Sequence, residues 1–394
     1  MTFRFMLPPH LAHLPSPPPD AEALSTELQQ RIRAAIAESG GWLRFARYME
    51  LALYAPGLGY YSAGSTKLGA AGDFITAPEL SPLFARCLAR QVAQIVALGI
   101  PAIVEVGAGS GVLAAQLLQS LEALGHLPER YLILEVSGDL RDRQHQRIAA
   151  QAPHLVDRVQ WLDVLPQNLQ AVLIANEVLD AVPTHRVRSR DGQIDEIGVT
   201  ASPDGEGFVR SDRPATGALL AAATALNLPD DYETEINLAS RAFVKSFAAR
   251  IERGAMILID YGFPAAEYYH PQRSSGTLMC HYRHHAHDDP FVLVGLQDIT
   301  AHVDFTAVAD AATQAGMTVL GYTTQAQFLI ASGITEILAE TCPDDVLAYA
   351  PLAGQAQKLL SPAEMGELFK VIALGRGLEA PLSGFARGDR THTL

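Results

Sequence analysis

A glycine-rich turn between a buried strand and a helix is the feature that most constrains how this chain folds. The run Ala102–Val106 is apolar except for one glutamate, as in strands that are buried on both faces. Residues 107–111 read Gly-Ala-Gly-Ser-Gly, and 112–124 has the composition of a helix. Gly107 can adopt a φ that a Cβ would forbid, and Gly109 lets a ligand lie against bare backbone. Because the helix start points free N–H groups at that ligand, the segment predicts a nucleotide-type cofactor.

The alternation of strand and helix continues beyond this turn. Short apolar, β-branched runs at 131–135, 159–162, 171–175 and 255–260 predict strands. They are separated by predicted helices, which is typical of a parallel sheet covered on both faces in an α/β protein. Further helices are expected over 42–53, 79–98 and 236–253, and residues 263–299 are expected to form a long His-rich loop.

The residues around the turn discriminate between cofactors. The dinucleotide fingerprint has Gly or Ala at its third position, where this chain has the larger Val112. Glu105 would repel a pyrophosphate, but it can hold the ammonium end of an amino acid. S-adenosylmethionine has that ammonium, a ribose and no phosphate. We therefore expect S-adenosylmethionine rather than NAD.

Two acidic positions follow the next predicted strands. Glu135 ends the second strand, where a carboxylate can accept hydrogen bonds from both ribose hydroxyls; an ordinary strand-end carboxylate is the alternative. Asp163 and Val164 follow the third strand, where an acid and an apolar residue would hold an adenine. The alternative role for Asp163 is a helix cap.

Charge and cysteine content exclude some classes of protein. Lys and Arg number 29 and Asp and Glu number 43, so the formal net charge is −14. Such a chain has no diffuse attraction to nucleic acid, whereas an acidic surface suits a cationic substrate. The three cysteines form no CxxC pair, which favours a reducing compartment. No apolar run reaches the ~18–20 residues of a membrane span, so we expect a cytoplasmic protein without a membrane span.

Several further blocks of sequence carry a resemblance to a known family. They are Tyr48-Met49, Leu53-Tyr54, Gly59-Tyr60-Tyr61, 72–79, 105–111, 135–137, 175–177, 180–183, Asp260-Tyr261-Gly262, 282–284, 288–289 and 298–305. On these residues the chain resembles the MidA-like S-adenosylmethionine-dependent methyltransferases. The mitochondrial members of that family are complex I assembly factors that dimethylate an arginine of a complex I subunit. The resemblance spans residues 45–328 and is loose in the C-terminal quarter.

The resemblance implies a fold and a cofactor site. It implies a class I methyltransferase (Rossmann-like) core, with a mostly parallel seven-stranded sheet, helices on both faces, N-terminal helices and helical insertions. Gly107, Gly109 and Gly111 match the family's cofactor loop, Glu105 the acid before it, and Glu135 the ribose acid.

The expected organisation divides the chain into five parts. They are a proline-rich tail (1–20), an N-terminal helical segment with a lid loop (21–100), a core (101–190, 255–323 and 368–376), an insertion (191–254) and a helical insertion (324–367).

Asn176 and Glu177 follow the fourth predicted strand, at the edge where class I methyltransferases meet their substrate. Arginine stays protonated in water. Methyl transfer to it therefore needs carboxylates that bind the guanidinium fork in a bidentate manner and draw its positive charge toward the nitrogens they contact. Glu177 and Asp180 are three residues apart and are expected to share one side of a helical turn. They form the predicted guanidinium clamp; acids in the first turn of a helix are the alternative.

Other polar residues are weaker candidates for the substrate site. The 64–79 segment is a candidate lid with polar residues Asp73, Thr76 and Glu79. His185 could accept a proton or be structural, and Tyr282 with Arg283 could line a substrate groove. The nearby histidines lack the spacing of a zinc site, so no metal is expected.

Three functional classes stay open at this stage. The first is a protein arginine methyltransferase acting on an exposed arginine, with a complex I-type subunit as the expected target. The second is a cofactor-binding assembly factor with little turnover. The third, disfavoured by Val112 and Glu105, is an NAD-dependent oxidoreductase.

Overall fold

The chain forms two compact units in the structure, a computed structural model that describes residues 11, 13–62, 75–205 and 207–394. The first unit comprises Met1–Phe74, Ala181–Ser240 and Glu267–His302. The second comprises Ile75–Asp180, Arg241–Ala266 and Val303–Leu394. Residues 267–302, which lie inside the predicted core range 255–323, thus belong to the first unit.

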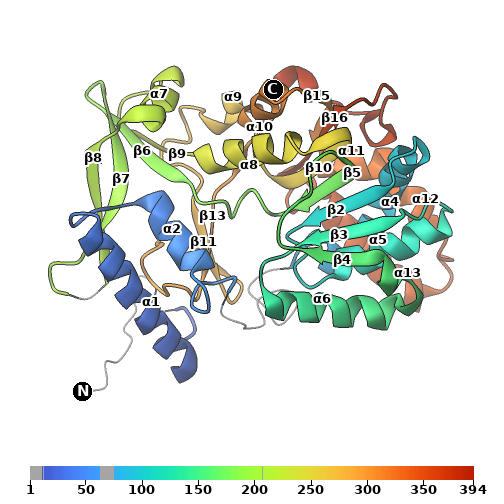
Figure 1. The fold of residues 1–394 in the computed structure, drawn as a ribbon, viewed down its shortest axis with the longest axis horizontal. Helices are drawn as coiled ribbons and strands as arrows, with labels where there is room; N and C mark the ends of the chain where they lie inside the picture. Colours follow the sequence, from blue (N-terminus) through green and yellow to red (C-terminus); the bar gives the residue numbers. More distant parts are fainter. Residues whose placement is uncertain (1–10, 12, 63–74, 206) are drawn as a thin grey trace. The chain divides into compact units, whose positions relative to one another are not determined.

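The second unit is built on a mixed sheet that contains eight strands among the described residues (Figure 1). The strands are β2 (Ala102–Val106), β3 (Arg130–Leu134), β4 (Val159–Leu162), β5 (Leu169–Asn176), β10 (Ile251–Phe263), β14 (Val303–Asp304), β15 (Thr318–Thr324) and β16 (Phe369–Arg376). Their order is β15-β16-β10-β5-β2-β3-β4, and β14 pairs with β10 beside this path. The five strands from β10 to β4 are parallel, and β16 runs antiparallel to both neighbours.

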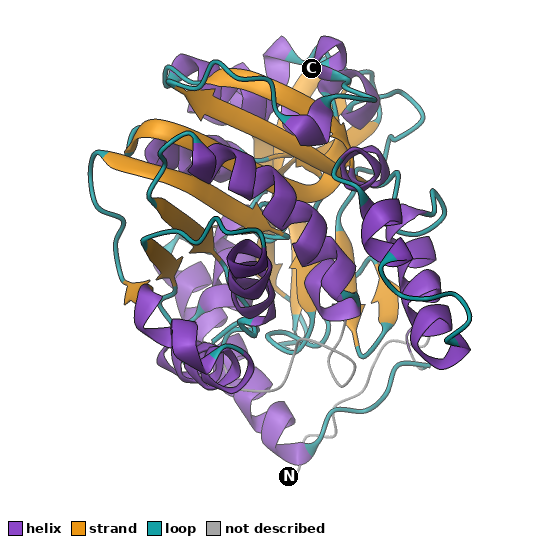
Figure 2. Ribbon diagram, turned by 90° about the vertical axis from the view of Figure 1, so that its right-hand side faces the viewer, coloured by secondary structure: helices purple, strands orange, loops and turns teal. Residues whose placement is uncertain are grey.

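Helices pack against this sheet; Figure 2 draws helices in purple and strands in orange. The helices are α3 (Ala77–Leu80), α4 (Pro82–Ala97), α5 (Val112–Ala123), α6 (Gly138–Gln151), α10 (Phe305–Gln314), α11 (Gln325–Ala331), α12 (Ile334–Ala339) and α13 (Val346–Leu360). Short 3-10 segments cover Pro153–Arg158, Ser383–Phe385 and Thr391–Thr393. Apolar residues of α4, α5 and α11–α13 share one core with alternate residues of the strands, including Ile103, Ile133 and Ile257. The predicted α/β class is confirmed.

The strand order determines where a ligand can bind. The sheet grows in opposite directions from β2, toward β4 on one side and toward β10 on the other. Ligands of open α/β sheets bind at the carboxyl ends of the strands beside such a reversal. In register, Val106 at the end of β2 pairs with Leu134 of β3 and with Ala175 of β5. The residues that follow these three positions therefore lie along one edge of the sheet.

The described residues of the first unit form antiparallel strands and three helices that lie wholly within it, α1 (Pro19–Glu38), α2 (Phe45–Tyr54) and α7 (Gly217–Ala225). One of its sheets contains β1 (Leu43–Arg44), β6 (His185–Arg190), β7 (Gln193–Ala201), β8 (Phe208–Pro214) and β9 (Tyr232–Ile236). The other contains β11 (Met279–Tyr282), β12 (His285–His287) and β13 (Asp298–Thr300). Two helices, α8 (Leu238–Ala248) and α9 (Ala265–Tyr268), cross the unit boundaries in the sequence.

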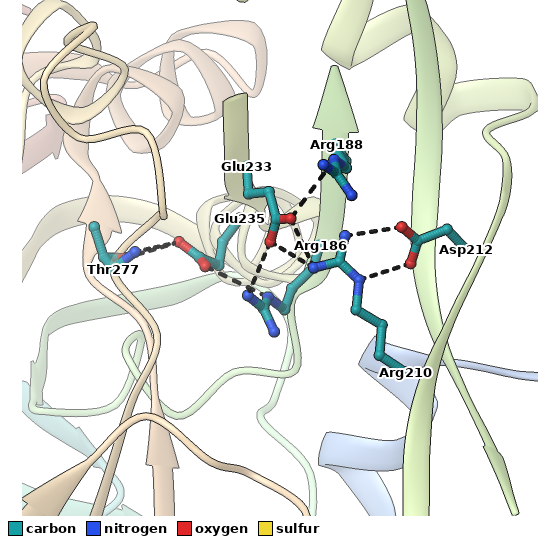
Figure 3. Close-up of polar contacts among 7 residues, drawn as sticks. All are labelled: Arg186, Arg188, Arg210, Asp212, Glu233, Glu235 and Thr277. Carbon is teal, nitrogen blue, oxygen red and sulfur yellow. Dashed lines mark hydrogen bonds and ion pairs between the residues drawn. The ribbon is translucent and has the colours of Figure 1, made fainter. Parts of the chain in front are cut away.

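A network of charged residues joins three strands of the first unit (Figure 3). The β6–β9 register places Arg186 opposite the buried Glu235. Glu233 accepts a hydrogen bond from Arg210 at 2.7 Å, and Glu235 accepts one from the Thr277 N–H at 2.8 Å. A buried carboxylate without such partners would be strongly destabilising, so the network supports the arrangement of these strands.

Five predictions need correction, three of which concern helices. The helix expected at 42–53 begins at Phe45, because 43–44 form β1. The helix expected at 79–98 is interrupted at Ser81, which is extended because Pro82 follows it. The helix expected to reach 253 ends at Ala248, and β10 begins at Ile251.

The remaining corrections concern strands. The expected loop 263–299 contains β11 and β12 and reaches β13, and the expected seven strands of the core sheet are joined by the short β14. The β11–β13 pairing joins Met279 to Thr300, so no local pattern could reveal it. None of the described helices is both long and apolar enough to span a bilayer.

Candidate functional site

The glycine turn after β2 has the conformation that its sequence predicted. Gly107, Gly109 and Gly111 have φ values of 70°, 52° and 80°, all in the left-handed region that favours glycine. Space is limited as well, because a Cβ at position 107 would lie 2.8 Å from Val178 Cγ2. A Cβ at position 111 would lie 2.9 Å from the Cα of Gln144. Gly111 precedes α5, so the turn leads directly to the free N–H groups of a helix start.

Glu105 lies in β2 just before this turn and is buried. Its Oε2 accepts a hydrogen bond of 2.6 Å from the hydroxyl of Tyr131 on β3. Burial raises the pKa of Glu105 to about 7, although the Tyr131 hydrogen bond opposes the shift. A cation beside this buried carboxylate would stabilise its charged form.

Glu135 follows β3 and is 9% exposed. Its Oε1 accepts the Ser137 N–H at 2.9 Å, and its Oε2 accepts Gln144 Nε2 at 3.1 Å. Gln144, which sequence reasoning missed, also donates to the Gly109 carbonyl and accepts from Trp161 Nε1. It thus connects the turn after β2 with the ends of β3 and β4. It lies inside the polar helix α6, where no sequence signal distinguishes it.

Asp163 follows β4 and pairs with Arg141 of α6, with 83% of its side chain exposed. No helix begins at Asp163, so the helix-cap alternative is wrong. The neighbouring Val164 is 67% exposed, and Val136 beside Glu135 is 83% exposed. Two exposed apolar side chains at the ends of adjacent strands are a suitable surface for an adenine ring.

The segment before α4 contacts the glycine turn. Ser110 Oγ donates a hydrogen bond to Glu79 Oε1, and Gln116 of α5 donates to the Pro78 carbonyl at 3.5 Å. Thr76 precedes α3 without capping it. Asp73 lies outside the described residues. Glu79 therefore contacts the glycine turn that is the predicted cofactor loop.

The residues after β5 form an irregular turn, and the expected helical turn is wrong. Glu177 has a φ of 53°, an uncommon conformation for a side chain of this size. Its N–H donates to the Ile259 carbonyl of β10 at 2.9 Å, and its Oε1 accepts Asn176 Nδ2 at 3.0 Å. Non-glycine residues with this φ cluster at functional sites, since the surroundings must compensate for their strain.

Asp180 and Asp260 complete an acidic group at this edge of the sheet. Asp180 is 5% exposed and accepts a hydrogen bond from the Tyr261 hydroxyl. Asp260 is buried, and burial raises its pKa well above the usual range, reinforced by the nearby charges of Asp180 and Glu177. Sequence reasoning gave Asp260 and Tyr261 no role, although their position at the end of a predicted strand was a usable signal.

Three predicted residues lie in the first unit. His185 Nδ1 is 2.8 Å from Glu196 Oε1, and His185 lines a surface pocket of about 500 Å³ together with Arg44, Arg47, Glu50 and Tyr54.

Tyr282 is buried in β11, and the Arg283 guanidinium lies 5.3 Å from its ring centre. Across the described parts of the chain, no three His, Cys, Asp or Glu residues are grouped to hold a metal.

Comparison with known proteins identifies the family. The family model described as "Putative S-adenosyl-L-methionine-dependent methyltransferase" matches residues 85–323, more than half of the chain. The chain belongs to this family. A crystal structure of a Burkholderia thailandensis protein bound to S-adenosyl-homocysteine is similar, with 52% identity and a TM-score of 0.94 over 97% of this chain and 100% of that one. Family membership confirms the predicted enzyme class and the predicted cofactor, S-adenosylmethionine.

Two curated relatives have a more specific name. The Drosophila melanogaster "Protein arginine methyltransferase NDUFAF7 homolog, mitochondrial" is 29% identical, over 93% of this chain and 90% of its own. The Danio rerio "Protein arginine methyltransferase NDUFAF7, mitochondrial" is 28% identical, over 85% and 83%. These relatives support the predicted resemblance to the MidA-like methyltransferases.

Proposed function

We propose that this methyltransferase transfers its methyl group to an arginine side chain of a protein. The observation that carries the proposal is the contact between two turns. The glycine turn after β2 and the acidic turn after β5 meet at Gly107 and Val178, where a Cβ would lie 2.8 Å from the valine methyl. A cofactor on the first turn would therefore lie next to the carboxylates of the second.

The residues of the β2–β4 edge suit S-adenosylmethionine. We assign Gly107, Gly109 and Gly111 to the bare backbone beside the ligand, and Glu105 to its ammonium group. Glu135 would accept the ribose hydroxyls, while Val164 and Asp163 would face the adenine. The cofactor supplies an electrophilic methyl group, and the protein has only to position the acceptor nitrogen in line with it.

The acidic turn would prepare that acceptor. A guanidinium group keeps its proton in water, with a pKa above ~12. Carboxylates that grip it in a bidentate manner draw the positive charge toward the nitrogens they contact, which leaves the remaining nitrogen a better nucleophile. We assign this clamp to Glu177 and Asp180, with Asn176 orienting Glu177 through its 3.0 Å hydrogen bond.

The proposed substrate is a protein with an exposed arginine, as the names of the curated relatives suggest. A complex I-type subunit is the first candidate, as the resemblance to the MidA-like methyltransferases implies. Free arginine would be a poor substrate, since it lacks the remote contacts that position a protein. We place the enzyme in the cytoplasm. The three free cysteines, two of them buried, support a reducing compartment, while the relatives named above are mitochondrial by name.

Transfer of labelled methyl groups tests the proposal. The purified chain is incubated with radiolabelled S-adenosylmethionine and either the purified candidate subunit or a lysate of cells that lack this chain. Acid hydrolysis and amino-acid analysis should then find the label in methylarginine. Label in methyllysine, or in small molecules alone, would contradict the arginine assignment. No transfer despite bound cofactor would favour an assembly factor.

A further inference from the structure

The sequence Asp260-Tyr261-Gly262 at the carboxyl end of β10 has no role in the function proposed so far. Asp260 and Tyr261 nevertheless form hydrogen bonds with the acidic turn after β5, which is about 80 residues earlier in the chain. Gly262 is required because β14 pairs beside it, and a Cβ there would lie 2.1 Å from the Val303 carbonyl oxygen. Gly262 therefore allows β14 to pair with β10, whereas the side chains of Asp260 and Tyr261 contact the turn after β5.

Asp260 holds the backbone of the acidic turn. Its Oδ2 accepts the N–H groups of Val178, Leu179 and Asp180 at 3.2, 2.9 and 3.2 Å. Its Oδ1 accepts the Tyr261 N–H at 2.9 Å. Three backbone donors of the turn share one oxygen of a buried carboxylate. This carboxylate fixes the turn's conformation, because its loss would leave these donors without their partner.

Tyr261 holds a side chain of the same turn. Its hydroxyl donates to Asp180 Oδ2, while its ring packs edge-on against Phe369 with centres 5.4 Å apart. The ring contact limits where the hydroxyl can point, so the Asp180 carboxylate is oriented from a fixed support. Glu177 is attached to the same strand, through its N–H and the Ile259 carbonyl.

We propose that Asp260 and Tyr261 are positioning residues for methyl transfer: Asp260 fixes the turn that carries Glu177 and Asp180, and Tyr261 orients the Asp180 carboxylate. This inference rests on the proposed function, because it assigns the turn to the methyl acceptor. Neither residue lies on the glycine turn or at the end of β3, where the cofactor is assigned. Their loss should therefore reduce transfer more than cofactor binding.

Tyr261→Phe is the milder test, since it keeps the ring on Phe369 and removes only the hydroxyl. With saturating cofactor, the kcat for methyl transfer should fall about 10–100-fold, as expected when a carboxylate loses a hydrogen bond in a closed site. The Kd for S-adenosylhomocysteine, measured by calorimetry, should change less than about 3-fold. Tyr232→Phe is the matched control, because its hydroxyl also donates one hydrogen bond, to the His270 carbonyl in the first unit.

Asp260→Asn tests the backbone support with a side chain of equal size. The amide oxygen can still accept from the turn, but the amide nitrogen cannot accept the Tyr261 N–H. The kcat should fall at least as far as in Tyr261→Phe, again with retained affinity for S-adenosylhomocysteine. Asp260→Glu, which restores the second carboxyl oxygen on a longer side chain, should recover part of the lost kcat.

The outcomes separate this inference from the proposed function. If the wild-type chain methylates another kind of acceptor, the arginine assignment fails, and the kcat ratios on that acceptor still test positioning. Wild-type kcat in both Tyr261→Phe and Asp260→Asn would overturn the positioning role. A parallel loss of S-adenosylhomocysteine binding and thermal stability would also overturn it, because it would show that the motif only supports the fold.

Discussion

The two edges of the site in the second unit are constructed differently. At the β2–β3 edge, a contiguous glycine turn is combined with Glu135 and with Gln144 of the nearby helix α6. At the β5–β10 edge, the turn after β5 is held by Asp260 and Tyr261 of a strand that is distant in the sequence. The first edge is therefore local, whereas the second exists only once the sheet has formed.

This difference separates two functions of the site, which are cofactor binding and positioning of the methyl acceptor. Backbone glycines and a strand-end acid suit a ligand that is the same in every turnover, such as the cofactor. Carboxylates on a turn with an unusual φ at Glu177 suit the reacting acceptor, where geometry must be exact to a fraction of an ångström. Variants at the first edge should therefore affect cofactor binding, and variants at the second should affect methyl transfer.

Gly109→Val should have the largest effect. Valine at a φ of 52° is strained, and its branched side chain would stand where the ligand needs bare backbone. We expect the affinity for S-adenosylhomocysteine to fall more than about 100-fold in calorimetry, equivalent to about 2.7 kcal/mol or more. Gly125→Val is the matched control, because Gly125 also has a positive φ but has open space around its missing Cβ. Equal losses of affinity in both variants would show that strain alone is responsible.

Glu177→Gln should have the next largest effect, on methyl transfer rather than on cofactor binding. The change keeps the size and removes the charge, so methyl transfer should fall roughly 10–1000-fold while cofactor affinity survives. Transfer is measured with labelled cofactor at saturation. The control is Glu129→Gln, an exposed carboxylate in the same unit. Normal turnover of Glu177→Gln would mean that Glu177 is only structural.

Glu135→Gln should weaken cofactor binding by about 10-fold, because one charged acceptor is lost and the other contacts remain. Both Ser137 and Gln144 currently donate to this carboxylate. At saturating cofactor, the rate of transfer should be close to that of the wild-type chain. A reduced rate at saturation would place Glu135 in the chemistry and weaken the separation between the edges.

Glu105→Gln should change a different property, the dependence of stability on pH. Because the folded state raises the pKa of Glu105 to about 7, its contribution to stability is fully present below the unfolded pKa near 4.5 and is lost as pH rises through about 7. That contribution is at most about 3 kcal/mol. Thermal unfolding from pH 5 to pH 8 should therefore show a flatter decline for Glu105→Gln. Identical pH profiles would mean that the buried carboxyl group does not titrate in this range.

The predictable part of the site follows the same division. Val106, Gly107 and Glu135 could be placed from the sequence, because strand, turn and helix are adjacent there and the parallel register aligns the strand ends. The shape of the turn at 177–180 could not, since Ile259 and Asp260 of β10 determine it. The strands β9 and β13 were missed for the same reason, because their partners β6 and β11 are distant in the sequence.

The most direct test of the division between cofactor edge and acceptor edge compares Glu177→Gln and Gly109→Val side by side. Each purified variant is titrated with S-adenosylhomocysteine and assayed for transfer of labelled methyl groups to the protein substrate. We predict that Glu177→Gln binds the ligand with wild-type affinity and forms little methylarginine, whereas Gly109→Val loses binding and transfer together. Loss of ligand binding in Glu177→Gln, or its transfer at the wild-type rate, would contradict the assignment of the two edges to cofactor and acceptor.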